Sequence, residues 1–217
     1  MVSSMTILTT EQRTADWFLA RTGKVTASRV KDVMAKLKNG KPAAERDRYL
    51  WELVAERLTG QATRHFQNGA MSHGVEYEIN ARIEFEFRTG QSVQEIGFCI
   101  HRELNDFGCS PDGLVGDYGL VEIKCPFNSA VHLQTLIAGE MPAEHMPQVQ
   151  AQMSVMGREW CDFVSFDPRM PDPFNCFITR VNRDEQYIDA MLAEIGAFLK
   201  DVEDSLRRVL STGDRRP

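Results

Sequence analysis

The sequence predicts an α/β fold in which a central mixed β-sheet is flanked by helices. Strand-like runs recur through the second half of the chain, helical repeats of apolar residues lie before and between them, and an amphipathic helix closes the sequence. With 217 residues, of which 42% are hydrophobic, the chain is long enough for one well-cored domain and too short for two. We therefore expect a single domain over residues 1–217.

Three helices are expected in the first ninety residues. Thr26 can cap the first helix, which the turn at 39–42 would end. Its apolar stripe would comprise Val30, Val33, Met34 and Leu37. The second helix is expected over about 44–58 with Gly60 as its stop, and its inward residues would be Leu50, Leu53, Val54 and Leu58. The third would begin near Ala70, end near Thr89-Gly90, and repeat Val75, Ile79 and Ile83 at helical spacing.

The remaining residues alternate between strand and helix patterns. Strands are expected at 93–101, 112–115, 120–125, 162–166 and 176–181. Helices are expected near 129–137 and 143–156 and over about 184–210, where the apolar face comprises Ile188, Met191, Leu192, Ile195, Phe198, Leu199 and Val202. We thus divide the domain into a basic N-terminal helical region (about 10–64), a core (about 65–182) and a C-terminal helix (about 184–210).

Two neighbouring segments, Ser110-Pro111-Asp112-Gly113 and Glu122-Ile123-Lys124, hold the candidate active site. Successive strand residues point to opposite faces of a sheet, so Glu122 and Lys124 share one face. The segment 116–119 is typical of a hairpin turn, which would bring Asp112 back to about the level of Glu122. Three charged groups are therefore expected to converge at one sheet edge.

This convergence suits metal-dependent hydrolysis of a phosphodiester bond. Asp112 and Glu122 offer the hard oxygen ligands that Mg2+ prefers, and the backbone carbonyl of Ile123 could add another. Glu78, on the third predicted helix, could supply a ligand from the other side of the pocket. A bound ion would activate water, which Lys124 could orient or deprotonate. The alternative interpretation is a surface hairpin with an ordinary Glu-Lys pair.

Charge is unevenly distributed along the chain. The formal net charge is −6, which would repel DNA if it were evenly spread. Residues 1–64, however, contain twelve Lys and Arg against seven Asp and Glu, so their net charge is +5 and that of the remainder is −11. The excess forms either a DNA-contacting surface or a solvated helix face. It includes Lys24, Arg29, Lys31, Lys36, Lys38 and Lys41.

Cysteine and histidine spacing does not indicate a further metal site. The five cysteines include no C-x-x-C pair, so we expect reduced, packed thiols rather than a zinc site or a disulfide framework. The five histidines show no ligand spacing and none is assigned to a metal. The apolar runs are too short to cross a bilayer and no signal pattern is seen, so we expect no membrane association and a cytoplasmic location.

Several linked motifs resemble those of one nuclease family. The order and spacing of these motifs are similar to the YqaJ-like viral recombinase family, which includes phage lambda exonuclease, within the PD-(D/E)xK superfamily. The resemblance runs from about Trp17 to the C-terminal helix and implies a restriction-endonuclease-like core. The motifs are Arg21 through Thr26-Ala27-Ser28, Gly74-x-x-x-Glu78, Cys109 to Leu114, Glu122 to Phe127, Gln148-Val149-Gln150 and Asp167 to Met170.

The resemblance implies a role for each matched residue. The metal ligands would be Asp112, Glu122, the Ile123 carbonyl and Glu78, with Lys124 as the catalytic lysine and Gln148 beside the centre. Arg21 and Ser28, with Ser110 nearby, would bind the 5′-terminal phosphate, which suits the donor fork of a guanidinium. Met71 falls where an apolar side chain wedges between the strands at the duplex end, and Lys38 where a basic residue reaches the minor groove.

The expected function is that of a processive 5′-to-3′ exonuclease that leaves 3′ single-stranded overhangs on linear duplex DNA for recombination by strand annealing. We expect two Mg2+ ions per site, with Mn2+ as a substitute. Polarity, a homotrimeric ring and a single-strand annealing partner follow from the resemblance alone, and the setting would be a bacterial or phage-infected cell. Two alternatives remain open, namely an endonuclease on the same core and a non-catalytic DNA-end-binding protein.

Overall fold

The computed structural model describes residues 6–8, 11–63 and 69–213, and its helices lie close to the predicted ranges beyond residue 44. Two 3-10 turns, Ala27–Arg29 and Ala143–His145, precede α2 and α6 respectively. The helices are α1 (Ala15–Arg21), α2 (Val30–Val33), α3 (Ala44–Thr59), α4 (Gly69–Thr89), α5 (Ser129–Ala138), α6 (Met146–Met156) and α7 (Glu185–Gly213).

The strands form two hydrogen-bonded sheets instead of the one central sheet that we predict. The smaller sheet has the order β1 (Thr6–Leu8), β4 (Phe98–Ile100), β5 (Phe107–Cys109), β2 (Val25–Thr26). The larger sheet has the order β3 (Val93–Gln94), β6 (Gly113–Val115), β7 (Gly119–Lys124), β8 (Trp160–Phe166), β9 (Cys176–Asn182). In the larger sheet β7 and β8 are parallel and the other neighbours are antiparallel, so the mixed character is confirmed.

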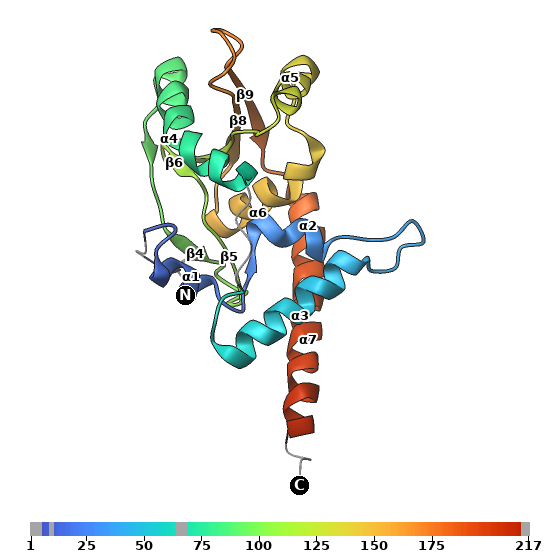
Figure 1. Ribbon diagram of the computed structural model, residues 1–217. Helices are drawn as coiled ribbons and strands as arrows, with labels where there is room; N and C mark the ends of the chain where they lie inside the picture. Colours follow the sequence, from blue (N-terminus) through green and yellow to red (C-terminus); the bar gives the residue numbers. More distant parts are fainter. Residues whose placement is uncertain (1–5, 9–10, 64–68, 214–217) are drawn as a thin grey trace.

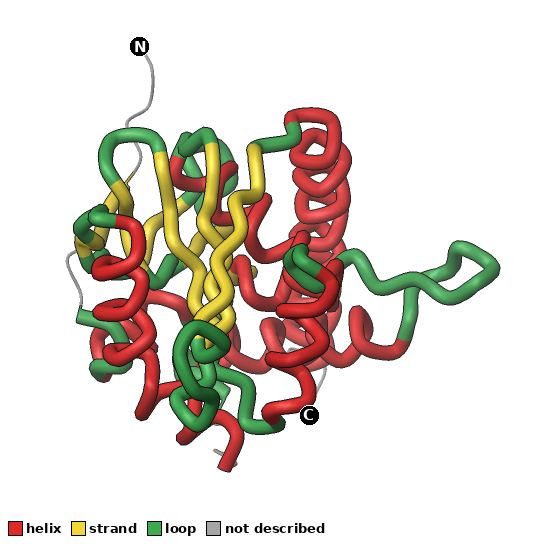
Figure 2. The backbone as a smooth tube through the Cα atoms, turned by 90° about the horizontal axis from the view of Figure 1, so that it is seen from above, coloured by secondary structure: helices red, strands yellow, loops and turns green. Residues whose placement is uncertain are grey.

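Helices cover both faces of the larger sheet, which confirms the α/β class. Figure 2 shows the strands between helices that lie on either side of them. On one face, Val121 and Ile123 of β7 belong to a core cluster with Ala81 and Phe85 of α4. On the other face, Leu120 belongs to the larger cluster, which includes residues of α3, α6 and α7. This double burial explains why β7 is an almost continuous buried run.

The helix predicted after Thr26 is wrong in its cap and its length. Thr26 makes no capping hydrogen bond with its side chain, and α2 ends at Val33. The chain then enters the loop 34–43, in which the N–H of Leu37 donates to the carbonyl of Lys41 over 2.7 Å. This hairpin-like bonding replaces continued helix, so Leu37 is exposed rather than part of an apolar stripe. Figure 1 shows the loop projecting between α2 and α3.

The α4 helix has the predicted extent but buries a different face. Val75, Ile79 and Ile83 recur at helical spacing, yet they are 43%, 63% and 59% exposed. Ala81 and Phe85 are fully buried and pack toward the sheet instead. An apolar stripe therefore runs along the outer surface of α4.

The C-terminal helix α7 packs along α3 and closes the larger core, as its apolar face predicts (Figure 1). The ring of Tyr49 stacks on Phe198 with centroids 5.5 Å apart, and Arg46 pairs with Asp201 at 2.8 Å. The α3 residues expected inside are buried except Leu58, which is exposed. No helix in the described ranges, α7 included, has both the length and the apolar character needed to cross a bilayer.

Four short elements, β1, α1, β2 and β5, have no counterpart in the sequence prediction. In addition, the predicted strand 93–101 is divided between β3 and β4, which belong to different sheets. Strands of two or three residues contain too few alternating positions for a pattern to identify them. Their place is set by pairing with distant segments, as when β2 pairs in parallel with β5.

Candidate active site

The predicted hairpin between β6 and β7 is confirmed, and it sets Asp112 beside the end of β7. The two strands pair with Gly113 opposite Val121. Asp112 then accepts a hydrogen bond of 2.6 Å on Oδ2 from the backbone N–H of Ile123. Glycine suits position 113 because a Cβ atom there would lie 2.1 Å from Cγ1 of Val93 in the neighbouring strand. The absence of a side chain at Gly113 thus lets β3 pack closely against β6, the strand that directly follows Asp112.

Glu122 is almost fully buried at the centre of a hydrogen-bond network. Lys124, on the same strand face, donates from Nζ to Oε1 of Glu122 over 2.5 Å. Gln148 donates to the same oxygen and Gln152 donates to Oε2, each over 2.6 Å. The glutamines lie one turn apart on α6, which lets both reach one carboxylate.

The charged groups at this centre shift one another's pKa values. Burial raises the pKa of Asp112 well above its usual range, and the nearby charge of Glu122 raises it further against the opposing effect of Lys124. For Lys124 itself, burial lowers the pKa, but Glu122 and Asp112 outweigh burial and the net pKa is raised. Lys124 therefore donates as an ammonium group to the Glu122 carboxylate.

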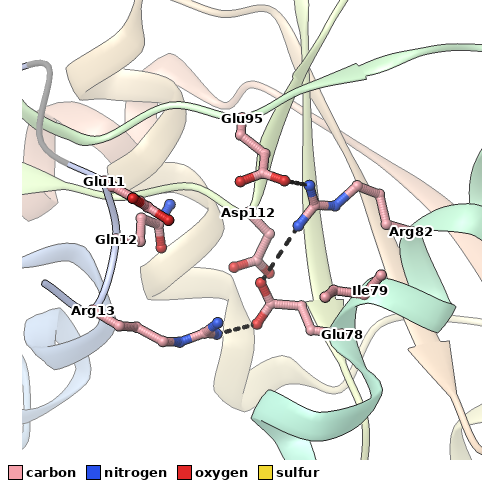
Figure 3. A pocket seen from close by; sticks show the side chains of 8 residues that line it. All are labelled: Glu11, Gln12, Arg13, Glu78, Ile79, Arg82, Glu95 and Asp112. Atoms are coloured by element: carbon pink, nitrogen blue, oxygen red, sulfur yellow. Dashed lines mark hydrogen bonds and ion pairs between the residues drawn. The ribbon is translucent and has the colours of Figure 1, made fainter.

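Glu78 approaches the centre from α4, on the opposite face of the sheet, and its carboxylate lies between two arginines. Nη2 of Arg13 pairs with Oε2 of Glu78, and Nη2 of Arg82 lies 3.9 Å from Oε1. These three residues and Asp112 line one pocket of about 300 Å³, shown in Figure 3. The structure thus brings Glu78 and Asp112 to a shared pocket, with Arg13 on the Glu78 carboxylate.

The donor atoms at this centre fit a hard divalent cation. In the described ranges, no group of three or more His, Cys, Asp or Glu side chains is arranged as a metal site. Nevertheless, Asp112 and Glu122 provide carboxylate oxygens, and a cation near them would relieve the repulsion that raises the pKa of Asp112. The groups that could hold the cation are Asp112, Glu122, the Ile123 carbonyl and Glu78.

Of the residues expected to bind a terminal phosphate, Ser28 and Ser110 lie just beyond the ends of β2 and β5, which pair in parallel, and Arg21 is the last residue of α1. Arg21 stacks its guanidinium on Trp17, 3.8 Å from the ring centroid, and the Trp17 indole donates to Oγ of Ser110 over 2.9 Å. Ser28 is exposed, with Oγ 3.3 Å from Oγ1 of Thr26. Arg21 and Ser110 are therefore linked through Trp17, and Ser28 stands on the neighbouring segment.

Arg21 is a desolvated cation. Burial lowers the pKa of Arg21 to about 10 despite the opposing attraction of Tyr49, Cys109 and Glu56, so the guanidinium remains charged at neutral pH. Within the part of the chain that the structure describes, it makes no hydrogen bond or ion pair. A guanidinium without a carboxylate partner is well suited to receive an anionic ligand.

The two residues expected to contact the duplex lie on separate elements. Lys38 is exposed in the projecting loop 34–43, and Met71 lies in the first turn of α4, where its side chain is outside the described part of the structure. The buried cysteines are free thiols, as expected. Burial raises the pKa of Cys99 and Cys176 to about 11 and that of Cys125 to about 12.

Sequence reasoning missed Arg13 and Arg82. Arg82 follows Glu78 by four residues on α4, and this spacing of opposite charges on a helix could have identified it. Arg13 lies outside the helices and strands, and no periodic pattern indicates where its side chain points.

Two comparisons with known proteins find matches. A model of the YqaJ-like viral recombinase domain matches residues 16–159. An alkaline exonuclease from Laribacter hongkongensis is 44% identical, with a TM-score of 0.86 over 93% of this chain and 99% of that one. Its complex with dAMP has the same identity and coverage and a TM-score of 0.87. Among curated protein sequences the chain has no match.

A more distant structure shows the fold alone. A phage-related exonuclease from Haemophilus somnus 129PT is 18% identical, with a TM-score of 0.65 over 86% of this chain and 96% of that one. The matches at 44% identity cover nearly the whole chain, and the matched domain contains the hairpin of Asp112 and Glu122.

Proposed function

Because the chain belongs to the YqaJ-like viral recombinase family, we propose that it is a Mg2+-dependent exonuclease that degrades one strand of duplex DNA from the 5′ end. Nuclease action on DNA is supported by the 44% identity to an alkaline exonuclease. The observation that carries the proposal is the meeting of Asp112, Glu122 and Lys124 at the end of β7, where a half-buried and a buried carboxylate lie beside one ammonium group.

The proposed cofactor is Mg2+, with two ions per site and Mn2+ as a substitute. When bound by Asp112, Glu122, the Ile123 carbonyl and Glu78, the metal would neutralise phosphate charge and lower the pKa of a water molecule. The oxygen-only donor set supports a hard cation over zinc or copper.

The chain's own residues would position the reacting groups. Hydrolysis adds a water oxygen to phosphorus, breaks the bond to the 3′ oxygen, and leaves a 5′-phosphate on the shortened strand. Because Nζ of Lys124 lies against the Glu122 carboxylate, we assign Lys124 to orienting or deprotonating the attacking water. Gln148 donates a hydrogen bond to Glu122 and accepts one from Nζ of Lys124 on Oε1 over 3.3 Å. It would therefore fix the positions of both side chains relative to each other.

Recognition of the DNA end is assigned to Arg21, Ser28 and Ser110. Each cut would create a new 5′-phosphate for the same pocket, which supports repeated action on one strand. In the N-terminal region, Arg29 and Lys36 are already paired with acidic residues. Other basic residues make no ion pair within the described ranges and are proposed to face the duplex, with Met71 at its end. They are Lys24, Lys31, Lys38 and Lys41.

A homotrimeric ring and a single-strand annealing partner complete the proposal. The exposed apolar stripe on α4, which Phe87 extends with 83% of its surface exposed, supports association with other chains, since soluble monomers rarely expose such patches. Enclosure of duplex DNA by a ring would give processivity without tight binding. A DNA substrate and an annealing partner would place the enzyme in the cytoplasm of a bacterial or phage-infected cell.

Linear duplexes with either 5′-phosphate or 5′-hydroxyl ends, labelled on one strand, test the proposal. With Mg2+ we expect nucleotides to be released from the 5′ end of the labelled strand, and to be released faster when that end carries a phosphate. With a chelator we expect no release. Lys124→Ala should release nucleotides at least about a hundredfold more slowly, because it removes a charged donor at the reacting phosphate. Wild-type rates in this variant, or loss of nucleotides from the 3′ end, would refute the mechanism.

The same assay distinguishes the two alternatives. Covalently closed circular duplex has no ends, so the proposed enzyme should leave it intact, whereas an endonuclease would cut it. A non-catalytic end-binding protein would bind the labelled duplex but release no nucleotide with Mg2+ or Mn2+.

A further inference from the structure

We propose that Arg13 is an internal counter-ion of the active site that competes with the divalent cation for Glu78. The inference rests on the metal ligands of the proposed function. Nη2 of Arg13 pairs with Oε2 of Glu78, and both residues line the pocket that contains Asp112 (Figure 3). The guanidinium occupies one acceptor site of the Glu78 carboxylate and offsets its negative charge, so it opposes the binding of a metal ion there.

The loop that carries Arg13 is fastened next to the catalytic hairpin. Nε2 of Gln12 donates to the carbonyl of Ile96 over 2.8 Å and to that of Pro111 over 2.9 Å. Pro111 directly precedes Asp112, so the loop is tied to the segment that supplies one proposed ligand. On the other side, Oγ1 of Thr14 donates to the carbonyl of Glu11 over 2.7 Å. Arg13 therefore reaches the pocket from an anchored turn.

The backbone of Arg13 is strained in a way that supports a role at the site. Its φ is 69°, the left-handed region that residues with a side chain rarely adopt, and among the described non-glycine residues it is the one with positive φ. Such a conformation is energetically unfavourable and persists where surrounding contacts enforce it, often at functional sites. Here the anchored neighbours enforce it, and Figure 3 shows the side chain extended toward Glu78.

The charges around Glu78 make Arg13 the exchangeable partner. Arg82 is less exposed, lies four residues along the same helix and pairs with Glu95 as well as Glu78. The side chain of Arg13 is 45% exposed, so it can turn to solvent while Glu78 remains in place. In the absence of a cation, Arg13 would balance part of the negative charge of Glu78 and Asp112. Its removal leaves a more negative pocket with Glu78 available.

Calorimetric titration of the full chain with Mn2+ tests this competition directly. Arg13→Gln should bind Mn2+ about five times more tightly than wild type, the change that corresponds to losing an exposed ion pair of about 1 kcal/mol. The matched variant Arg102→Gln, which removes one exposed positive charge outside the pocket, should bind as wild type does. Arg13→Lys retains the charge without the guanidinium fork and should give a smaller gain of about twofold.

Two further variants separate this inference from the proposed function. Asp112→Asn should greatly weaken Mn2+ binding, and wild-type affinity in that variant would overturn the proposed metal site itself. If Asp112→Asn weakens binding but neither Arg13 variant tightens it, the role of Arg13 alone is refuted. In a Glu78→Gln background, Arg13→Gln should have no further effect. A fivefold gain there would show that Arg13 does not act through Glu78 and would overturn the inference.

Discussion

Gln152 donates a hydrogen bond of 2.6 Å from Nε2 to Oε2 of Glu122, deep between α6 and β7. The opposite oxygen of Glu122 receives Lys124 and Gln148. Oε1 of Gln152 is itself buried without a hydrogen-bond partner in the described structure, and an unpaired buried acceptor costs about 1–3 kcal/mol. The side-chain N–H of Gln152 thus supplies a hydrogen bond to Glu122, while the side-chain oxygen of Gln152 stays unpaired. We infer that Gln152 positions the Glu122 carboxylate.

Replacing Gln152 by Leu should lower kcat about tenfold or more, because Oε2 of Glu122 loses its donor and the carboxylate can rotate. Gln150→Leu is the matched control. Gln150 is equally buried on α6 but donates to the carbonyl of Asn182, so its loss should reduce the melting temperature and leave kcat within about twofold. Steady-state kinetics and thermal unfolding measure both, and an unchanged kcat in Gln152→Leu would exclude the positioning role.

Asp112→Asn should stabilise the metal-free protein while it abolishes activity. The pKa of Asp112 is raised in the folded state by burial and by Glu122, so the stability it contributes is fully present below its unfolded pKa of about 4 and is lost as pH rises. The variant should therefore melt several degrees higher than wild type at pH 7 in chelator, with a smaller difference near pH 4. A lower melting temperature at pH 7 would contradict this assignment.

Arg21→Ala should abolish the preference for phosphorylated ends. Wild type should degrade a 5′-phosphorylated duplex faster than a 5′-hydroxyl duplex, and the variant should degrade both at similar rates, because its pocket lacks the unpaired guanidinium. Arg48→Ala, which removes an exposed arginine of α3, should keep the preference. The degradation rates of the two labelled duplexes by each variant measure this preference. If Arg21→Ala still prefers the phosphorylated duplex, the phosphate is recognised by other residues.

The pair of Asp167 and Arg169 should make the fold sensitive to strong acid. Burial would raise the pKa of Asp167, but its hydrogen bonds with Arg169 and Ser129 outweigh burial and lower it to about 2. This carboxylate therefore contributes stability above its unfolded pKa of about 4, and the contribution is lost as pH falls toward 2. Asp167→Asn should be less stable than wild type by about 1–2 kcal/mol at pH 7.

Denaturant unfolding at several pH values measures this difference. The two proteins should converge in stability as the pH approaches 2. A gap that stays constant over the whole range would show that the asparagine acts through packing rather than through charge. Arg169 also donates to the carbonyls of Pro126 and Phe127, over 3.1 and 3.0 Å, so the same pair fastens the segment that follows Lys124.

The centre of the site follows from local rules. A hairpin turn and strand alternation place Asp112, Glu122 and Lys124 together, and helical spacing directs Gln148 and Gln152 to one carboxylate. Where several elements compete for the same residues, pattern rules fail. The apolar repeat of α4 faces outward because Ala81 and Phe85 pack against the sheet instead.

The sequence by itself therefore determined the fold class and the hairpin that bears the proposed catalytic groups, since residues within about a dozen positions of one another meet through backbone geometry alone. Only the tertiary structure decided what surrounds them. Arg13 and Glu78 are separated by 65 positions, and Trp17 and Ser110 by 93. Contacts over such distances depend on how whole helices and strands pack, because no local pattern in the sequence relates the two partners.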